Sequence, residues 1–97
     1  MARRRSVNSP VAEVEAREEL LALALERLGG KVQLPARVWL NYLPEADMLT
    51  IRLKARHQST RSEDDLRRGL IFNYEGQKLV SIEVLDLYGT FTKTRAQ

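Results

Sequence analysis

The residues between positions 57 and 65 include the side chains that nucleophilic catalysis uses. His57, the single histidine of the chain, is followed by hydroxyl and carboxylate side chains at Ser59, Thr60, Ser62, Asp64 and Asp65. A hydroxyl activated by a histidine that a carboxylate orients is the arrangement of many hydrolases. Here the candidates are sequence neighbours within residues 55–68, a polar segment predicted to be a loop, and nothing supplies an oxyanion hole. We therefore expect no catalytic residue and no enzyme.

Metal and cofactor sites have equally little support in the sequence. Glu63, Asp64 and Asp65 form an acidic run that could hold a divalent cation weakly, but the spacing of a calcium loop is absent. The run is predicted to be a solvated loop or the first turn of a short helix. The chain has no cysteine, which excludes thiolate metal sites. We expect neither a metal nor a cofactor.

The charge distribution leaves nucleic-acid binding open as the alternative function. The net charge of +3 equals the contribution of Arg3, Arg4 and Arg5 at the start of the chain. A basic arm can bind phosphates without sequence preference, and it would act with the other basic residues Lys31, Arg37, Lys54 and Arg56. Three arginines at a disordered terminus are, however, more often solubilising than phosphate-binding.

The composition indicates one small globular domain. A chain of 97 residues that is 43% hydrophobic and 30% charged has enough apolar side chains for one modest core. No segment resembles a secretory signal, and the apolar run of residues 20–25 is too short to cross a bilayer. A cytoplasmic location is therefore expected.

Residues 10–28 are predicted to form a helix. Ser9 can cap its N-terminus and Pro10 suits the first helical position, while Gly29 and Gly30 follow its end. The apolar stripe of this helix is predicted to consist of Val14, Leu21, Leu25 and Leu28, widened by Leu20 and Leu23. Such a stripe needs a surface to cover it.

Two similar segments predict two β-hairpins. "NYLPEADMLTIRL" at residues 41–53 and "NYEGQKLVSIEVL" at residues 73–85 both pass from Asn-Tyr through a turn into alternating apolar and polar residues. Leu49, Ile51 and Leu53, with Val80, Ile82 and Val84, are predicted to face the core. If the second strands of the hairpins are neighbours, Arg52 and Glu83 could form an ion pair on the exposed face.

The predicted fold is therefore α+β, with an N-terminal helix packed on an antiparallel sheet of about four strands built from two β-hairpins. We expect a basic disordered arm at residues 1–9, the helix at 10–30, the two-hairpin β domain at 31–91 and a frayed tail at 92–97.

Trp39 and Leu43 are the predicted protein interface. If Leu40 faces the core, both side chains lie on the opposite face of the first strand. One helix covers a width of about 10 Å, whereas four strands at a spacing of ~4.8 Å are wider. Apolar surface would therefore be left over, and a large aromatic residue there is a frequent interface anchor. We expect a homodimer in which a second chain buries Trp39.

The segments "VWLNYLPEADMLTIRL" and "GLIFNYEGQKLVSIEVLDLYG" resemble the domain of unknown function (DUF) family 2283, over roughly residues 38–88. The matching positions are Tyr42, Pro44, Glu45, Ala46, Asp47, Leu49, Ile51, Arg52 and Leu53 in the first half and Gly69, Ile71, Tyr74, Val80, Ile82, Glu83 and Leu85 in the second. Leu43, Asn73 and Ser81 depart from the family pattern. The resemblance implies no established activity. Genes of such proteins often neighbour those of small ribonuclease-type toxins, which implies an antitoxin-like role in binding a small partner protein.

A second stretch, from "GGKVQLPARV" through "EADMLTIRL", resembles the swapped-hairpin DNA-binding domain of AbrB-type regulators. In those proteins Leu-Pro opens a short helix, which would make the chain a nucleic-acid-binding regulator. The alternation from Val38 to Leu43 instead favours a strand, so the two resemblances predict different structures for the same residues.

Overall fold

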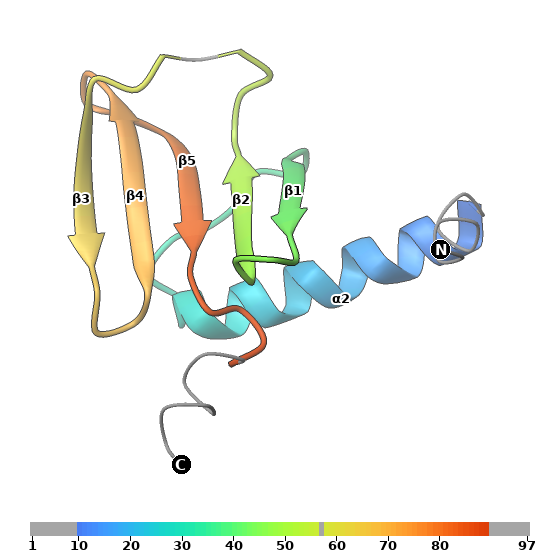
Figure 1. Cartoon of the computed structure of the whole chain (residues 1–97). Coiled ribbons are helices and arrows are strands. Elements are labelled where there is room, and N and C mark those ends of the chain that lie inside the picture. Colours follow the sequence, from blue (N-terminus) through green and yellow to red (C-terminus); the bar gives the residue numbers. More distant parts are fainter. Residues whose placement is uncertain (1–9, 57, 90–97) are drawn as a thin grey trace.

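A computed structural model describes residues 10–56 and 58–89 of the chain, with side chains from residue 16 onward (Figure 1). Its elements in chain order are helix α2 (Pro10–Leu28) and strands β1 (Trp39–Leu43), β2 (Met48–Arg52), β3 (Arg61–Asp65), β4 (Leu70–Glu75) and β5 (Lys78–Val84). The predicted α+β class is confirmed. The predicted count of about four strands is wrong, because the antiparallel sheet has five.

The two predicted hairpins form the middle of the sheet, whose strand order is β1-β2-β5-β4-β3. Strands β2 and β5 are central neighbours, with Ile51 opposite Ile82. Strand β1 pairs with β2 and β4 pairs with β5, all antiparallel. The hairpins are therefore related by an approximate two-fold axis through the sheet between Ile51 and Ile82. This relation places Asn41 of β1 and Asn73 of β4 in equivalent positions.

Strand β3 corrects the prediction that residues 55–68 form a loop. Residues 61–65 pair with β4 along their whole length, from Arg61 opposite Tyr74 to Asp65 opposite Leu70. Four of these five residues are exposed. An edge strand with both faces in solvent needs no apolar alternation, so the sequence pattern that reveals half-buried strands is missing from it.

Two four-residue turns lie at the same end of the sheet and share one geometry. The turn of residues 44–47 ends at Asp47 with a φ of 51°, and the turn of residues 66–69 ends at Gly69 with a φ of 69°. The carbonyl of Asp47 accepts from the N–H of Leu87 at 2.9 Å, and that of Gly69 accepts from the N–H of Leu85 at 2.8 Å. Both turns therefore hold the segment that follows β5.

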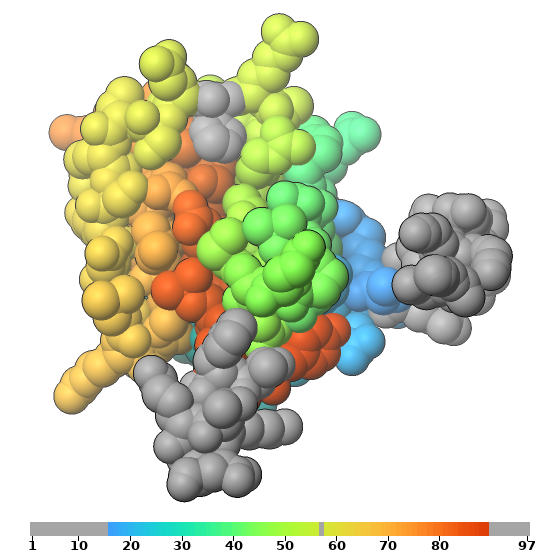
Figure 2. Space-filling view, in the orientation of Figure 1, coloured from blue at the N-terminus to red at the C-terminus, as the bar shows by residue number. Residues whose placement is uncertain are grey.

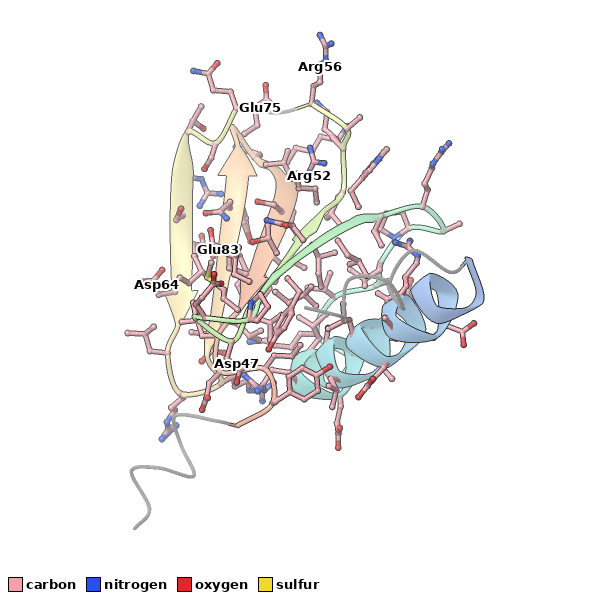
Figure 3. All side chains as sticks on the ribbon, turned by 45° about the vertical axis from the view of Figure 1, so that its right-hand side comes forward. Asp47, Arg52, Arg56, Asp64, Glu75 and Glu83 are labelled. Atoms are coloured by element: carbon pink, nitrogen blue, oxygen red, sulfur yellow. The ribbon has the colours of Figure 1, made fainter. Side chains whose placement is uncertain are left out.

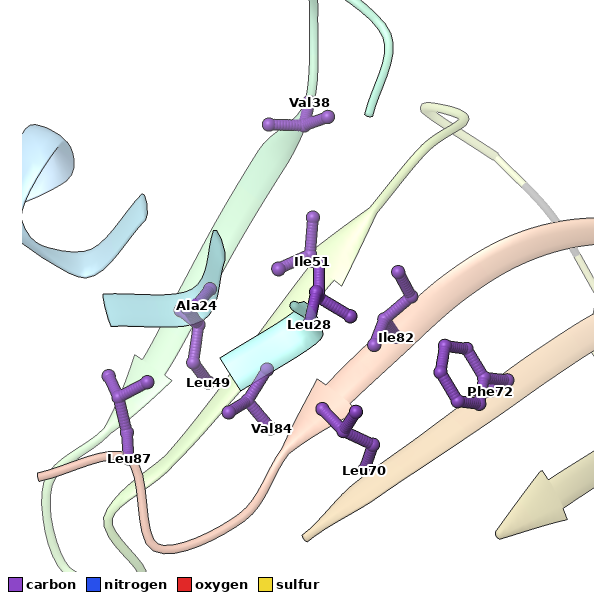
Figure 4. Packing of buried hydrophobic residues seen from close by; sticks show 10 residues of the cluster. All are labelled: Ala24, Leu28, Val38, Leu49, Ile51, Leu70, Phe72, Ile82, Val84 and Leu87. Carbon is purple, nitrogen blue, oxygen red and sulfur yellow. The ribbon is translucent and has the colours of Figure 1, made fainter. Parts of the chain in front are cut away.

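The core lies on one face of the sheet and includes residues of α2 (Figure 4). The predicted inward positions of the two central strands are confirmed, because Leu49, Ile51, Val80, Ile82 and Val84 have no exposed surface. Further residues of the same buried cluster are Leu70, Phe72, Val38, Leu87, Ala24 and Leu28.

The predicted apolar stripe of the helix needs correction at one position. Leu28 is 1% exposed and Ala24 is completely buried, whereas Leu25 is 49% exposed. Ala24 and Leu28 are four residues apart and so lie on one side of the helix, whereas Leu25 lies about 100° from Ala24 around the axis. The buried side is centred on Ala24, whose small side chain does not stand out in a pattern of large apolar residues. Val14 and Ser9 fall outside the side chains that the structure describes.

Arg27 on α2 binds the backbone of the segment after β5. Its guanidinium donates to the carbonyl oxygens of Leu85 at 2.7 Å and Asp86 at 2.8 Å, and also to that of Arg68 at 3.1 Å. These carbonyls therefore have a charged donor, and the end of the helix is attached to the same end of the sheet as the two turns.

The two leucines near the end of α2 provide a matched test of this arrangement. We expect Leu28→Ala to lower the free energy of unfolding by about 2–5 kcal/mol, because it opens a cavity in the core. Leu25→Ala should change it by only about 0.5 kcal/mol, as for most surface substitutions. Urea denaturation followed by circular dichroism measures both. Equal losses for the two variants would contradict the observed orientation of the helix.

Candidate functional site

The candidate interaction surface is the face of the sheet opposite the core, here called the outer face. No part of α2 lies in front of it in the space-filling view (Figure 2). Strand β1 contributes Trp39, Asn41 and Leu43 to this face, since Leu40 and Tyr42 between them pack against the core. The opposite residues on β2 are Arg52, Thr50 and Met48. The two predicted interface residues thus lie on one face and one strand.

Trp39 is half-buried by residues of its own chain. The guanidinium groups of Arg37 and Arg52 lie 5.7 Å and 6.0 Å from the centre of its ring, which is the range of cation–π attraction. Leu43, at the other end of β1, is 40% exposed. Trp39, Leu43 and half-buried Met48, which lies opposite Leu43 on β2, are here called the apolar strip; Asn41 separates Trp39 from Leu43.

The middle of the outer face is polar and internally hydrogen-bonded. The amide nitrogen of Asn73 donates to Ser81 Oγ at 3.0 Å and to Glu83 Oε2 at 3.1 Å, and Ser62 Oγ donates to Asn73 Oδ1 at 2.6 Å. Asn73 is 8% and Ser81 3% exposed. Because these groups satisfy one another, this region supplies few unmet polar groups to a partner.

The predicted pairing of Arg52 with Glu83 is wrong. The two strands are neighbours, but Glu83 lies opposite Thr50 and Arg52 lies opposite Ser81. The labelled side chains of Arg52 and Glu83 lie at different levels along the sheet (Figure 3). Arg52 instead donates to the carbonyl of Ala55 at 2.8 Å, and Glu83 accepts from Asn73. Because Arg52 and Glu83 are diagonal rather than direct neighbours across the two strands, each side chain forms its hydrogen bond with another residue.

The residues considered for nucleophilic catalysis do not come together in the part of the chain that the structure describes. His57 lies outside it. Asp64 and Asp65 are successive residues of β3 and so point to opposite faces. The carboxylate of Asp65 is ion-paired with Lys31 at 3.6 Å. The hydroxyl of Ser62 is bound to Asn73.

Residues 10–56 and 58–89 give no support to a metal-ion site or a membrane-spanning helix. No group of three or more histidine, cysteine, aspartate or glutamate side chains that could hold a metal ion occurs among them. None of their helices is long and apolar enough to cross a membrane.

The basic residues of the nucleic-acid alternative are mostly engaged. Lys31 is paired with Asp65, and Lys54 lies 3.5 Å from Glu75 Oε1. Arg37 lies over Trp39, and Arg56 is exposed. Arg3, Arg4 and Arg5 lie outside the described residues. Nucleic-acid binding would therefore depend chiefly on these three arginines, which the structure does not describe.

A hollow of about 550 Å³ lies at the end of the sheet near the close of α2. It is lined by Arg27, Leu66, Arg67, Arg68, Gly69, Leu85, Asp86 and Gly89. Its most central cation, Arg27, already donates to several carbonyl oxygens. The hollow is thus part of the contact between helix and sheet and has few uncommitted groups for a ligand.

Asp47 forms the most buried polar cluster near the candidate surface, and the sequence predicted no role for it beyond its match to the family pattern. The residue is 1% exposed. Its Oδ1 accepts from the Tyr42 hydroxyl at 2.7 Å, and both of its carboxylate oxygens lie 3.1 Å from the N–H of Tyr88. The rings of Tyr42 and Tyr88 meet edge to face at 5.6 Å. An aspartate at the end of a Pro-Glu-Ala-Asp turn, a residue type that tolerates the positive φ found there, is the one local sequence signal that could have marked this residue.

The environment of Asp47 changes the acidity of both tyrosines. Burial of the ring raises the pKa of the Tyr42 hydroxyl well above its ordinary value, and the hydrogen bond to the Asp47 carboxylate and its negative charge raise it further. Burial also raises the pKa of Tyr88, with smaller contributions from the charges of Glu19 and Asp47. Both hydroxyls therefore stay protonated in the folded protein at neutral pH.

A comparison with protein families matches residues 39–87 to the family described as "Protein of unknown function (DUF2283)". The match begins at the first residue of β1 and ends at Leu87, whose N–H binds Asp47, so it contains all five strands and excludes α2. Neither the curated proteins nor the solved structures gave a significant match to this chain.

Replacement of Asp47 tests the cluster. We expect Asp47→Ala to lower the free energy of unfolding by roughly 2–4 kcal/mol, because buried donors on Tyr42 and Tyr88 lose a charged acceptor. Asp47→Asn should cost less, since asparagine keeps one acceptor oxygen and tolerates a positive φ. Urea denaturation measures the difference. Equal stability of wild type and Asp47→Ala would exclude a structural role for the carboxylate.

The raised tyrosine pKa values predict a loss of stability in alkali. Below the ordinary tyrosine pKa of 10.0 both folded and unfolded chains carry the neutral hydroxyl, so stability is complete. Above it the unfolded chain loses protons first, and the free energy of unfolding falls as pH rises. Urea denaturation at about pH 8 and about pH 11 should show this fall, and Tyr42→Phe should reduce it. An unchanged fall in Tyr42→Phe would mean that other groups cause it.

Proposed function

The chain belongs to the DUF2283 family, and we propose that it is a non-catalytic protein-interaction domain that acts as a homodimer. The observation that carries the proposal is the apolar strip of Trp39, Leu43 and Met48 on the outer face of β1 and β2, which α2 does not cover. A large aromatic residue such as Trp39 is a frequent anchor of protein interfaces.

The form of the strip supports a second copy of the chain as the occupant. All five residues of β1 lack charge, so two copies of this strand can approach without repulsion between their own side chains. The arginines beside Trp39 keep its ring in place before association, which lowers the entropy lost on binding. A two-fold dimer needs a patch that is complementary to itself, and an apolar strip meets that requirement.

The cellular role is the second part of the proposal. We place the dimer in the class of proteins that bind and cover a small partner protein, as expected of an antitoxin-like role. Its support is the family resemblance together with an outer face whose polar groups are largely satisfied. Co-expression with the product of the neighbouring gene, followed by co-purification of a complex of defined stoichiometry, tests this role. Failure of the two to associate would remove it.

Replacement of Trp39 tests the homodimer. We expect wild-type protein to sediment as two chains and Trp39→Ala to sediment as one, with an unchanged circular dichroism spectrum. Leu66→Ala is the matched control, because Leu66 is 68% exposed but lies on the β3–β4 turn away from the strip. A wild-type monomer whose Trp39 is already shielded from fluorescence quenchers would overturn the proposal.

The alternative function, nucleic-acid binding, predicts a different outcome for the same purified protein. Affinity for DNA or RNA that falls steeply with salt, and that is lost when Arg3, Arg4 and Arg5 are replaced by alanine, would favour it. The proposed interaction domain should instead keep its dimer through that replacement.

A further inference from the structure

The outer edge of β1 has backbone groups that no strand of the described chain uses. The N–H of Leu53 donates to the carbonyl of Val80 on β5. The backbone N–H and C=O groups of successive strand residues point to opposite neighbouring strands. Ile51, two residues before Leu53, therefore forms its backbone hydrogen bonds with β5, and Thr50 forms its backbone hydrogen bonds with β1. Asn41, opposite Thr50, therefore bonds toward β2. The N–H and C=O groups of Leu40 and Tyr42 point to the outer edge.

The two edges of the sheet differ in their protection against another strand. Strand β3 carries Glu63, Asp64 and Asp65, so two copies of it would bring negative charges together. Charged side chains on an edge are a common defence against unwanted pairing. Strand β1, with the sequence Trp-Leu-Asn-Tyr-Leu, has no such defence.

We propose that β1 pairs antiparallel with β1 of a second copy, centred on Asn41, so that two five-stranded sheets become one continuous sheet. This inference rests on the proposed function, and it specifies how the homodimer forms. Leu40 would lie opposite Tyr42 of the second copy, and the outward backbone groups of each such pair would exchange both hydrogen bonds.

The side chains of β1 are complementary in this register. Trp39 lies opposite Leu43 of the second copy, so the two predicted interface residues contact each other on the outer face. Asn41 lies opposite its own copy, and an amide side chain can both donate and accept. Arg17 of α2 donates a hydrogen bond to the backbone carbonyl of Val38 at 2.9 Å. The carbonyl just before β1 is therefore already bonded, so the edge that a second strand could use begins at β1.

The approximate two-fold relation of the hairpins supports an added strand at this place. On β4, the equivalent of β1, the outer edge is occupied by β3, and Ser62 of β3 binds Asn73. Asn41 is the equivalent of Asn73 and is exposed. Helix α2 continues past β1 on the side where the second sheet would lie (Figure 1). The second copy would thus supply to β1 what β3 supplies to β4.

Single cysteines test the register, because the natural chain has none. Directly opposite residues of an antiparallel pair have Cα atoms about 4.5–5.5 Å apart, which suits a disulfide. We expect Asn41→Cys to form a disulfide-linked dimer nearly completely under mild oxidation, as read on a non-reducing gel. Ser62→Cys on the β3 edge and Thr50→Cys on the outer face of β2 should remain largely uncrosslinked. Circular dichroism verifies that each variant is folded.

The outcomes separate this inference from the proposed function. A wild-type dimer in which Thr50→Cys crosslinks and Asn41→Cys does not would mean that outer faces stack; that result overturns edge pairing and leaves the homodimer intact. Equal crosslinking of Ser62→Cys and Asn41→Cys would also overturn edge pairing. A wild-type protein that sediments as a monomer and whose Asn41→Cys variant stays uncrosslinked would overturn both proposals.

Discussion

The buried Asp47 carboxylate joins β1 and the turn after it to the segment beyond β5, which is far away in the sequence, and the position of β1 depends on it. The residue closes the turn after β1, binds the hydroxyl of Tyr42 within β1, and accepts from Tyr88 beyond β5. A buried carboxylate is costly unless donors surround it, so these partners cannot move independently. Since β1 is an edge strand with one neighbour in the described chain, this cluster holds it in place together with the ladder to β2 and the packing of Leu40 on the core.

A second set of contacts makes the same end of the sheet rigid. Gly69 accepts from Leu85 much as Asp47 accepts from Leu87, and a Cβ at Gly69 would lie 3.2 Å from the Leu85 oxygen. Arg27 then binds the carbonyls of the same segment from the helix. The turns, the segment after β5 and α2 therefore form one scaffold. The candidate surface extends from it along β1, ending at Trp39, where the chain's own arginines hold the ring.

The sequence predicted the parts of this fold whose residues differ strongly in burial. The alternation of Leu49 and Ile51, and of Ile82 and Val84, follows from one covered face. Strand β3 was not predictable in this way, because a strand exposed on both faces leaves no alternation. Ala24 was passed over because a small side chain marks close approach of a helix rather than apolar area. The role of Asp47 depends on Tyr88, forty-one residues later, and local turn composition carries no information about such a partner.

The repeated Asn-Tyr pair explains why the two hairpins are not equivalent in their surroundings. In β4 the neighbouring strand covers both residues, since Ser62 binds Asn73 and Arg61 lies 4.2 Å from the ring centre of Tyr74. In β1 the tyrosine turns to Asp47 instead, and the asparagine remains exposed at the sheet edge. One hairpin is therefore completed within the chain, whereas the other keeps an uncharged strand with its hydrogen-bonding groups directed outward. An unprotected edge of this kind readily accepts another strand. Its contrast with the charged β3 edge on the opposite side of the sheet is therefore best explained by pairing with a second chain.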